Sequence, residues 1–197
     1  MTAAILGPDG VARCPWGSNG GVLGNYHDTE WGLPVDGENG LFERLSLEGA
    51  QAGLSWLTIL NKRERYREIF HAFDVDAAAA MTDADLDAAM LDPGIVRNRA
   101  KVNSVRTNAR AVIALRAEGG LEALVESFAP KKTPRPRITA QLPTTSPESL
   151  ALSKALKKRG FSFVGPTTMY ALWEATGIVD THLTGCHRRG CGGRWPA

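Results

Sequence analysis

The chain has 197 residues, of which 43% are hydrophobic and 22% are charged, and its formal net charge is +2. These proportions are typical of an ordinary globular protein of one domain and exclude extended disorder. No apolar run reaches the roughly 18 residues of a membrane span. The first ten residues, MTAAILGPDG, lack a basic segment followed by a long apolar one, so we expect a cytoplasmic protein. Its three cysteines are then better interpreted as thiols or metal ligands than as disulfides.

Charge is distributed unevenly along the chain. Residues 1–92 carry 6 Lys and Arg against 15 Asp and Glu, whereas residues 93–197 carry 17 against 6. The basic residues of the second half gather around 97–110, 131–137 and 154–159. A polyanion such as DNA or RNA would suit this half. Solvated helix faces are the alternative, and the charge pattern alone does not separate the two.

Helical periodicity dominates the first half of the chain, and no stretch alternates cleanly between apolar and polar residues. Apolar residues within 41–52 and 56–70 predict two amphipathic helices in succession, with Ser55 as the N-cap of the second. Thr82 followed by Asp85 resembles a capping box that opens a further short helix.

The second half of the chain is also predicted to be helical. Residues 102–115 indicate a longer basic helix that is closed by a glycine pair at 119–120. The segment 130–145 holds four of the eleven prolines and is expected to be an exposed loop. Ser146 and Pro147 are typical of a helix start, and 167–175 predicts the last long helix. The predicted fold class is therefore all-α.

A turn between two helices is a candidate phosphate contact. Residues 154–170 read KALKKRGFSFVGPTTMY, in which a basic helix ends at Gly160 and a new one follows Gly165. Glycine at such a turn lets backbone N–H groups face outward, and the following helix N-terminus adds the positive end of its dipole. Together these features favour a phosphate oxygen. A plain helix–loop–helix connection is the alternative.

This turn resembles the helix-hairpin-helix of the base-excision DNA glycosylase superfamily, and the segment 179–182, VDTH, resembles the aspartate segment of that superfamily. In its bifunctional lyases, a lysine lies two places beyond the second hairpin glycine. Here that position is Thr167, so the resemblance implies a monofunctional hydrolase without a Schiff-base lysine.

Further motifs narrow the resemblance to the 3-methyladenine DNA glycosylase I family. They follow in the order of that family from Cys14 to Cys186: RCPW at 13–16, YHD at 26–28, EWG at 30–32, LEGAQAGLSW at 47–56, GIVRNRAKV at 94–102, LSKALKKRGFSFVG at 152–165 and HLTGC at 182–186.

The resemblance implies an all-α, monomeric enzyme of two helical lobes that removes 3-methyladenine from double-stranded alkylated DNA in base excision repair. The glycosylase domain is expected at 13–190, with a flexible extension at 1–12 and a tail at 191–197. The alternative is a protein on the same scaffold that binds alkylated DNA without cleaving it.

Two cysteines and two histidines form a candidate metal site that joins the ends of the chain. Cys14 and His27 lie near the start, and His182 and Cys186 near the end. Two thiolates and two imidazoles suit a structural zinc ion, which would contribute folding stability. Spacing alone leaves open two buried thiols and two surface histidines. The resemblance places zinc ligands at all four positions.

A glycosylase must hold the extruded base between aromatic faces. Trp16, Tyr26 and Trp56 lie in matching motifs and are the candidates, with core packing as the alternative. Glu48 sits among small residues on an otherwise apolar helix and needs a partner. By resemblance it is the catalytic residue that accepts hydrogen bonds from the base, supported by Gln51 one turn on. A glutamate on the helix surface, or one paired with a helix N-terminus or an arginine, is the alternative.

The remaining candidates contact DNA or differ from the pattern of the family. Gly53 and Leu54 form a candidate wedge for the gap that the base leaves, with ordinary core packing as the alternative for Leu54. Gly160, Gly165 and Thr167 are expected to contact the DNA backbone.

At two positions the resemblance to the family leaves the site less fully specified. Leu23 replaces an expected aromatic residue of the pocket. Asp180 either assists catalysis by stabilising the sugar cation, or caps a helix or orients His182.

Overall fold

The structure, a computed structural model, describes residues 2–197, and most of these residues are helical. A two-stranded antiparallel sheet, in which Ile5 pairs with Arg13 and Leu6 with Ala12, is an addition to the predicted all-α fold. The strands are β1 (Ile5–Leu6) and β2 (Ala12–Arg13). The α-helices are α1 (Gly21–Thr29), α2 (Gly37–Gln51), α3 (Trp56–Ile69), α4 (Val75–Ala80), α5 (Asp83–Leu91), α6 (Arg99–Leu115), α7 (Gly120–Ser127), α8 (Pro147–Lys158) and α9 (Pro166–Ala175). Short 3-10 turns occupy His71–Phe73, Arg116–Glu118 and Thr139–Gln141.

Three predicted helix starts are confirmed at the level of the cap. The Ser55 hydroxyl accepts a hydrogen bond from the Thr58 N–H at 3.2 Å. Thr82 and Asp85 form a reciprocal capping box at the start of α5. Ser146 caps α8, and Pro147 occupies its first position. These side chains satisfy backbone N–H groups that a helix leaves unpaired at its start.

Some helices differ from the predicted ones. Helix α2 ends at Gln51, so Ala52 lies just outside it. Helices α1, α4 and α7 were not predicted. Helix α7 begins at Gly120, a residue that the sequence indicates as a stop, because Gly119 adopts the left-handed conformation and redirects the chain into a new helix.

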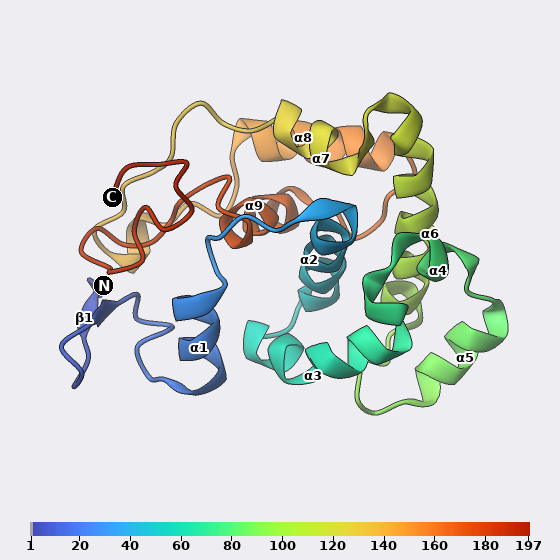
Figure 1. The fold of residues 1–197 in the computed structure, drawn as a ribbon, viewed down its shortest axis with the longest axis horizontal. Coiled ribbons are helices and arrows are strands. Elements are labelled where there is room, and N and C mark those ends of the chain that lie inside the picture. The colour runs from blue at the N-terminus through green and yellow to red at the C-terminus, as the bar shows by residue number, and fades with distance from the viewer. Residues whose placement is uncertain (1) are drawn as a thin grey trace.

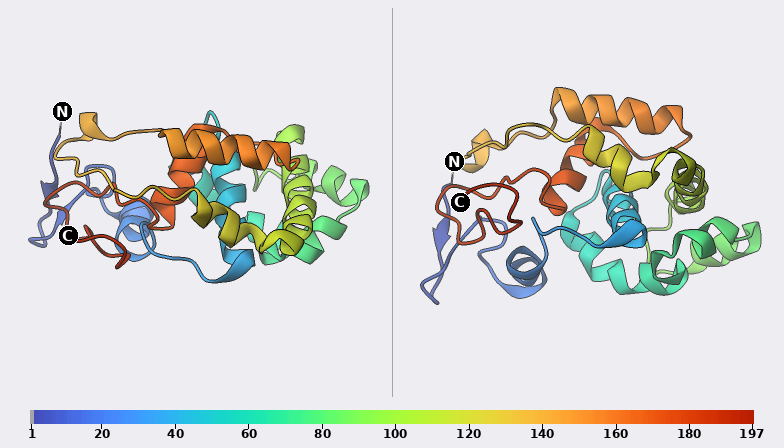
Figure 2. Two further views of the ribbon diagram at one scale, coloured as in Figure 1. Left: turned by 90° about the horizontal axis from the view of Figure 1, so that it is seen from above. Right: turned by 45° about the horizontal axis from the view of Figure 1, so that its top comes forward.

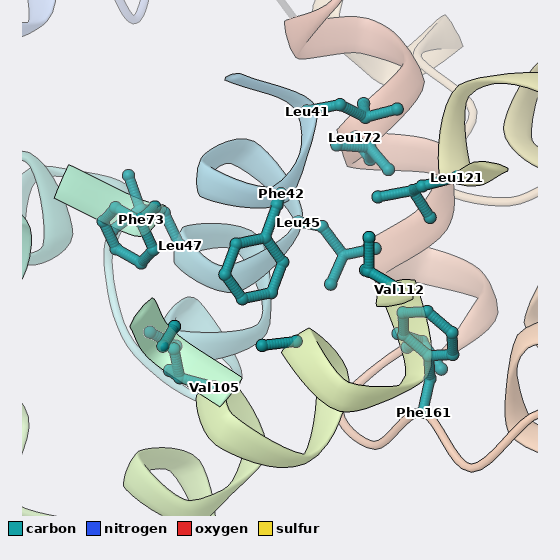
Figure 3. Packing of buried hydrophobic residues seen from close by; sticks show 14 of the residues in the cluster. Leu41, Phe42, Leu45, Leu47, Phe73, Val105, Val112, Leu121, Phe161 and Leu172 are labelled. Atoms are coloured by element: carbon teal, nitrogen blue, oxygen red, sulfur yellow. The ribbon is translucent and has the colours of Figure 1, made fainter. Parts of the chain in front are cut away.

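The core lies around α2, which packs against α3, α6, α7 and α9. Figure 3 shows apolar side chains from these helices meeting around Phe42 and Leu45 of α2, which are fully buried. Val112 of α6, Leu121 of α7 and Leu172 of α9 complete the contact. Burial of this apolar surface is the main stabilising term, and it fixes α2 and α9 as a rigid base for the site.

Both ends of the chain lie at the same end of the molecule, opposite α5 (Figures 1 and 2). The His187 N–H donates to the Ala12 carbonyl at 2.9 Å, and the Thr184 N–H donates to the Pro136 carbonyl at 2.7 Å. The tail is also tied down, since the Trp195 Nε1–H donates to the Ile178 carbonyl at 3.0 Å. Within residues 2–197, no helix is long and apolar enough to cross a membrane.

Candidate active site

A cavity of about 300 Å³ opens beside α1, α2, α3 and α9. Two larger hollows lie elsewhere on the surface, but this cavity gathers four aromatic side chains and two carboxyl groups. It therefore has the composition of a site for a planar, polar guest. The lining residues are Trp16, Leu23, Tyr26, Trp31, Glu48, Gln51, Ser55, Trp56, Leu57, Ala171 and Glu174.

Aromatic rings form the walls of the cavity. The ring centroids of Trp16 and Trp31 lie 5.0 Å apart in an edge-to-face arrangement. Those of Tyr26 and Trp56 lie 5.5 Å apart, and Trp16 lies 6.4 Å from Tyr26. The predicted aromatic residues are thus brought together around one space, in which a flat base would contact ring faces and edges. Leu23 also lines the cavity, at the position where an aromatic ring was expected.

Glu48 faces this space from α2. Only 6% of the residue is exposed, and within the described chain its carboxyl group takes part in no hydrogen bond or ion pair. Burial, with a smaller contribution from the nearby charge of Glu174, raises the pKa of Glu48 to about 8, and Arg44 opposes the rise. The surface alternative for Glu48 is therefore wrong. The side chain is a buried acceptor that needs a partner from outside the chain.

Two donors on the cavity wall are also unpaired. The Tyr26 hydroxyl and the Trp56 Nε1–H are buried and find no hydrogen-bond partner among residues 2–197. Native proteins seldom leave buried polar groups without a partner, because each costs about 1–3 kcal/mol.

An ion-pair network connects residues behind the cavity-lining Tyr26. Glu30 accepts hydrogen bonds from Arg44 at 2.6 Å and from both terminal nitrogens of Arg63 at 2.8 and 2.9 Å. The Arg44 guanidinium also lies 5.9 Å from the centre of the Tyr26 ring. These contacts link α1, α2 and α3, and they fix the ring of Tyr26 against the site.

The loop between α2 and α3 carries the predicted wedge. Leu54 is 40% exposed, so its core alternative is wrong, and Gly53 before it has a φ of 77° that favours glycine. The Lys101 Nζ of α6 anchors this loop by donating to the carbonyls of Ala50 at 2.8 Å and Ala52 at 2.6 Å. An exposed apolar side chain therefore sits on a fixed loop beside the cavity.

The turn at 159–165 joins α8 to α9, which pack against each other. Asn108 of α6 holds the turn with two hydrogen bonds, donating to the Ser162 carbonyl at 3.0 Å and accepting from its N–H at 2.9 Å. Gly160 needs glycine because its φ is 86°.

Gly165 has an ordinary φ of −62°. A Cβ added there would make only an ordinary contact with the Thr168 hydroxyl, at 3.8 Å. The fold itself therefore does not require glycine at this position, which leaves room for a partner. Thr167 is exposed in the first turn of α9.

A cluster of thiols and imidazoles lies at the end of the molecule that holds both termini. One ligand atom each of Cys14, His27 and Cys186 lies within 4.8 Å of the others, and all three residues are buried. The His27 Nε2 is 3.4 Å from the Cys186 Sγ, while its Nδ1 bonds to Asp28 at 2.7 Å. A carboxylate that holds Nδ1 leaves Nε2 free for a metal ion.

His182, the fourth predicted ligand, lies next to this cluster. Its ring centroid is 5.3 Å from that of His27, and its Nδ1 lies 3.0 Å from the Asp180 carboxylate. Its Nε2 is buried with no hydrogen-bond partner in the described part of the chain. His182 is not part of the group whose ligand atoms lie within 4.8 Å of one another, but a buried nitrogen without a partner on a ring that neighbours His27 fits a fourth protein ligand.

Asp180 belongs to this cluster, and it is not among the residues that line the cavity. Besides the His182 ring, its carboxylate accepts the backbone N–H of His182 at 3.0 Å and that of Gly190 at 2.8 Å. Burial alone would raise the pKa of Asp180, but these hydrogen bonds outweigh it, so the pKa is lowered and the group stays charged. This geometry favours the orienting role of Asp180 over the catalytic one.

Sequence reasoning missed five of the lining residues, of which Trp31 and Glu174 bear most on the site. Trp31 lies in the quoted EWG motif, and its ring stands 4.4 Å from that of His182, so it joins the cavity to the cysteine–histidine cluster. Glu174 is a lone carboxyl group in the apolar helix α9. That isolation was a signal, but only the fold shows that it lines the same cavity as Glu48.

Comparisons with known proteins agree with this geometry. The profile of the methyladenine glycosylase family matches residues 16–189. The chain is 46% identical over 180 residues to a DNA-3-methyladenine glycosylase of Haemophilus influenzae, covering 89% of this chain and 97% of that protein. The crystal structure of a 3-methyladenine DNA glycosylase I superposes with a TM-score of 0.86 at 43% identity, covering 90% and 99% of the two chains. A variant of such an enzyme in complex with 3-methyladenine gives 0.84 at 36% identity, covering 90% and 97%.

Proposed function

Because the chain belongs to the methyladenine glycosylase family, we propose that it is a monofunctional DNA glycosylase. It hydrolyses the N-glycosidic bond of 3-methyladenine in alkylated double-stranded DNA, as the first step of base excision repair inside the cell, and it acts as a monomer. The observation that carries this proposal is the aromatic cavity of about 300 Å³, in which the buried Glu48 carboxyl group lacks a partner from the described chain.

The base reaches this cavity by leaving the duplex. The Leu54 side chain enters the gap in the stack, which repays part of the cost of extrusion. Trp16, Tyr26, Trp31 and Trp56 then enclose the base. Extruding a damaged base costs less free energy than extruding an undamaged one, so the substrate is already favoured before the glycosidic bond breaks.

Glu48 recognises the base and stabilises the positive charge of the base. Alkylation at N3 leaves adenine positively charged in DNA, so the base is already a good leaving group and needs little acid catalysis. The bond between the sugar C1′ and the base breaks, a water oxygen bonds to C1′, and the water proton goes to solvent. The positive charge of the bound base favours the ionised form of Glu48, so its proton is lost to solvent and the carboxylate stabilises the oxocarbenium-like transition state. A lysine at position 167 would add lyase activity, but Thr167 stands there.

The turn at 159–165 acts as the helix-hairpin-helix that holds the DNA backbone. The open space at Gly165 and the N-terminus of α9 accept a phosphate oxygen. The exposed lysines 154, 157 and 158 on α8 add a positive field that depends on salt concentration. Much of the other basic surface is neutralised internally, since Arg99, Arg106 and Arg116 form ion pairs with acidic side chains.

Cys14, His27, His182 and Cys186 hold a structural zinc ion. The carboxylates of Asp28 and Asp180 orient the two imidazoles, each through Nδ1. When bound, the ion contributes folding stability and no chemistry at the base. It fixes the segments that carry Trp16 and Trp31, and so it holds one wall of the cavity in place.

The direct test is the release of free base from methylated duplex DNA by the purified protein, resolved by chromatography, with Glu48→Gln in parallel. We expect 3-methyladenine from the wild type and a rate for the variant that is about 100-fold lower or more, because Glu48→Gln removes the charged acceptor. Release of 7-methylguanine alone would contradict the proposed substrate. Tighter binding of methylated than of unmethylated DNA without release would support the alternative of a non-catalytic sensor.

A further inference from the structure

The cavity contains a second carboxyl group that the proposed mechanism does not use. Glu174 projects from α9 into the space that Glu48 faces from α2. The Thr181 hydroxyl donates to its Oε1 at 2.6 Å, which fixes the direction of the side chain. Within residues 2–197 no cationic side chain forms a salt bridge with Glu174, so no ion pair neutralises its charge inside the cavity that it lines.

The two carboxyl groups affect each other. The charge of Glu174 contributes to the raised pKa of Glu48, and burial raises the pKa of Glu174 itself to about 7. Arg44 is the basic group that offsets charge at Glu48, and it is already bound to Glu30. A positively charged guest in the cavity that both carboxyl groups line would relieve this repulsion, whereas a neutral guest of the same shape would leave it in place.

We propose that Glu174 is a second base-contacting residue, and that it makes the cavity selective for a positively charged purine over a neutral one. This inference rests on the proposed function, because it assigns a specificity to the same cavity. Glu48 recognises the hydrogen-bonding edge of the base from one side. Glu174 acts from α9, which packs against α2, and its contribution grows with the charge of the base and not with its shape.

The test compares a charged base with a neutral one of the same shape. One duplex carries 3-methyladenine, and the other carries 3-deaza-3-methyladenine, which lacks the positive charge and resists hydrolysis. The excision rate constant is measured for the first duplex under single-turnover conditions, and the dissociation constant for the second. Glu174→Gln keeps the size of the side chain and an acceptor for Thr181 but removes the charge. Glu122→Gln, at an exposed position of α7, is the control for net charge.

We expect Glu174→Gln to lower the single-turnover excision rate constant for 3-methyladenine by about tenfold or more, since the loss of a hydrogen bond to a charged group has an effect of that size. Its affinity for the neutral analogue should change by less than about twofold to threefold, within the range of surface substitutions. Glu174→Asp, which keeps the charge, should recover part of the loss. Glu122→Gln should behave like the wild type in both assays.

Either of two results would overturn the inference. Unchanged excision by Glu174→Gln would show that the carboxyl group does not contact the base. Equal losses with both duplexes, accompanied by a lower melting temperature, would show a structural role instead. Absence of 3-methyladenine release by the wild type would refute the proposed function, which is a separate outcome because it does not depend on residue 174.

Discussion

Replacing Glu48 with glutamine should stabilise the folded protein at alkaline pH while it removes the excision activity. Burial raises the pKa of Glu48 from 4.5 to about 8. Between these values the folded protein holds a proton that the unfolded chain has lost, so the free energy of unfolding falls as the pH rises through this window. Below about pH 4.5 the acid is neutral in both states, and above about pH 8 the whole destabilisation is present.

The size of the effect follows from that window. Each pH unit across it corresponds to about 1.4 kcal/mol, so the upper limit is roughly 5 kcal/mol. Solvent at the mouth of the cavity screens part of the charge, and about 2–4 kcal/mol is the expected gain at pH 8.5. Glutamine is nearly isosteric with the neutral acid, so at pH 5 the two proteins should differ by less than about 1 kcal/mol.

Urea unfolding followed by circular dichroism at pH 5, 7 and 8.5 measures this difference. Groups that do not interact with Glu48 cancel when the variant is subtracted from the wild type, whereas Glu174 interacts with Glu48 and titrates in the same window, so its change is part of the measured difference. Glu122→Gln is the matched control, because it removes a carboxylate from an exposed position and should change stability by less than about 0.5 kcal/mol at each pH. A Glu48→Gln protein that is less stable than the wild type at pH 8.5, or more stable by the same amount at every pH, would refute the reasoning.

Three further substitutions test other parts of the molecule. Cys14→Ser should lower the zinc content and the melting temperature together, and an unchanged zinc stoichiometry by atomic absorption would exclude Cys14 as a ligand. Leu54→Ala should reduce excision from duplex DNA by about tenfold, with little effect on a single-stranded substrate and a change in stability below about 0.5 kcal/mol, because the side chain is exposed; equal losses on both substrates would contradict the wedge. Lys101→Met leaves the carbonyls of Ala50 and Ala52 without their donor and should cost about 2–4 kcal/mol in urea unfolding; a stability equal to the wild type would show that this anchor is dispensable.

Local signals in the sequence predicted much of the helical fold. The caps at Ser55, Thr82 and Ser146 were predicted because each depends on residues within one turn of the helix start. The two-stranded sheet near the N-terminus was missed. Its strands have two residues each, which is too short for an alternating pattern to be visible.

The site was harder to predict than the helices, because it depends on which distant segments meet. Trp16, Tyr26, Trp56 and Glu48 were found through their motifs, whereas Trp31 was missed although it lies in one of them. Glu174 was missed, because its partner in the cavity comes from another helix and no local pattern shows which space a side chain faces. The two roles left open for Asp180 also required coordinates, since the bonds to His182 and Gly190 separate them.

The contacts between the two ends of the chain have a consequence for synthesis. The Leu183 N–H bonds to the Cys14 Sγ at 3.4 Å, and the His27 Nε2 lies 3.4 Å from the Cys186 Sγ. A ribosome makes the N-terminal partners first, so Cys14 and His27 have no partners until nearly the whole chain has emerged. The neighbouring Trp16 and Trp31 cannot take their final places before then. A nascent or prematurely terminated chain therefore lacks a finished cavity, and a protein that is still attached to the ribosome cannot release a base from DNA.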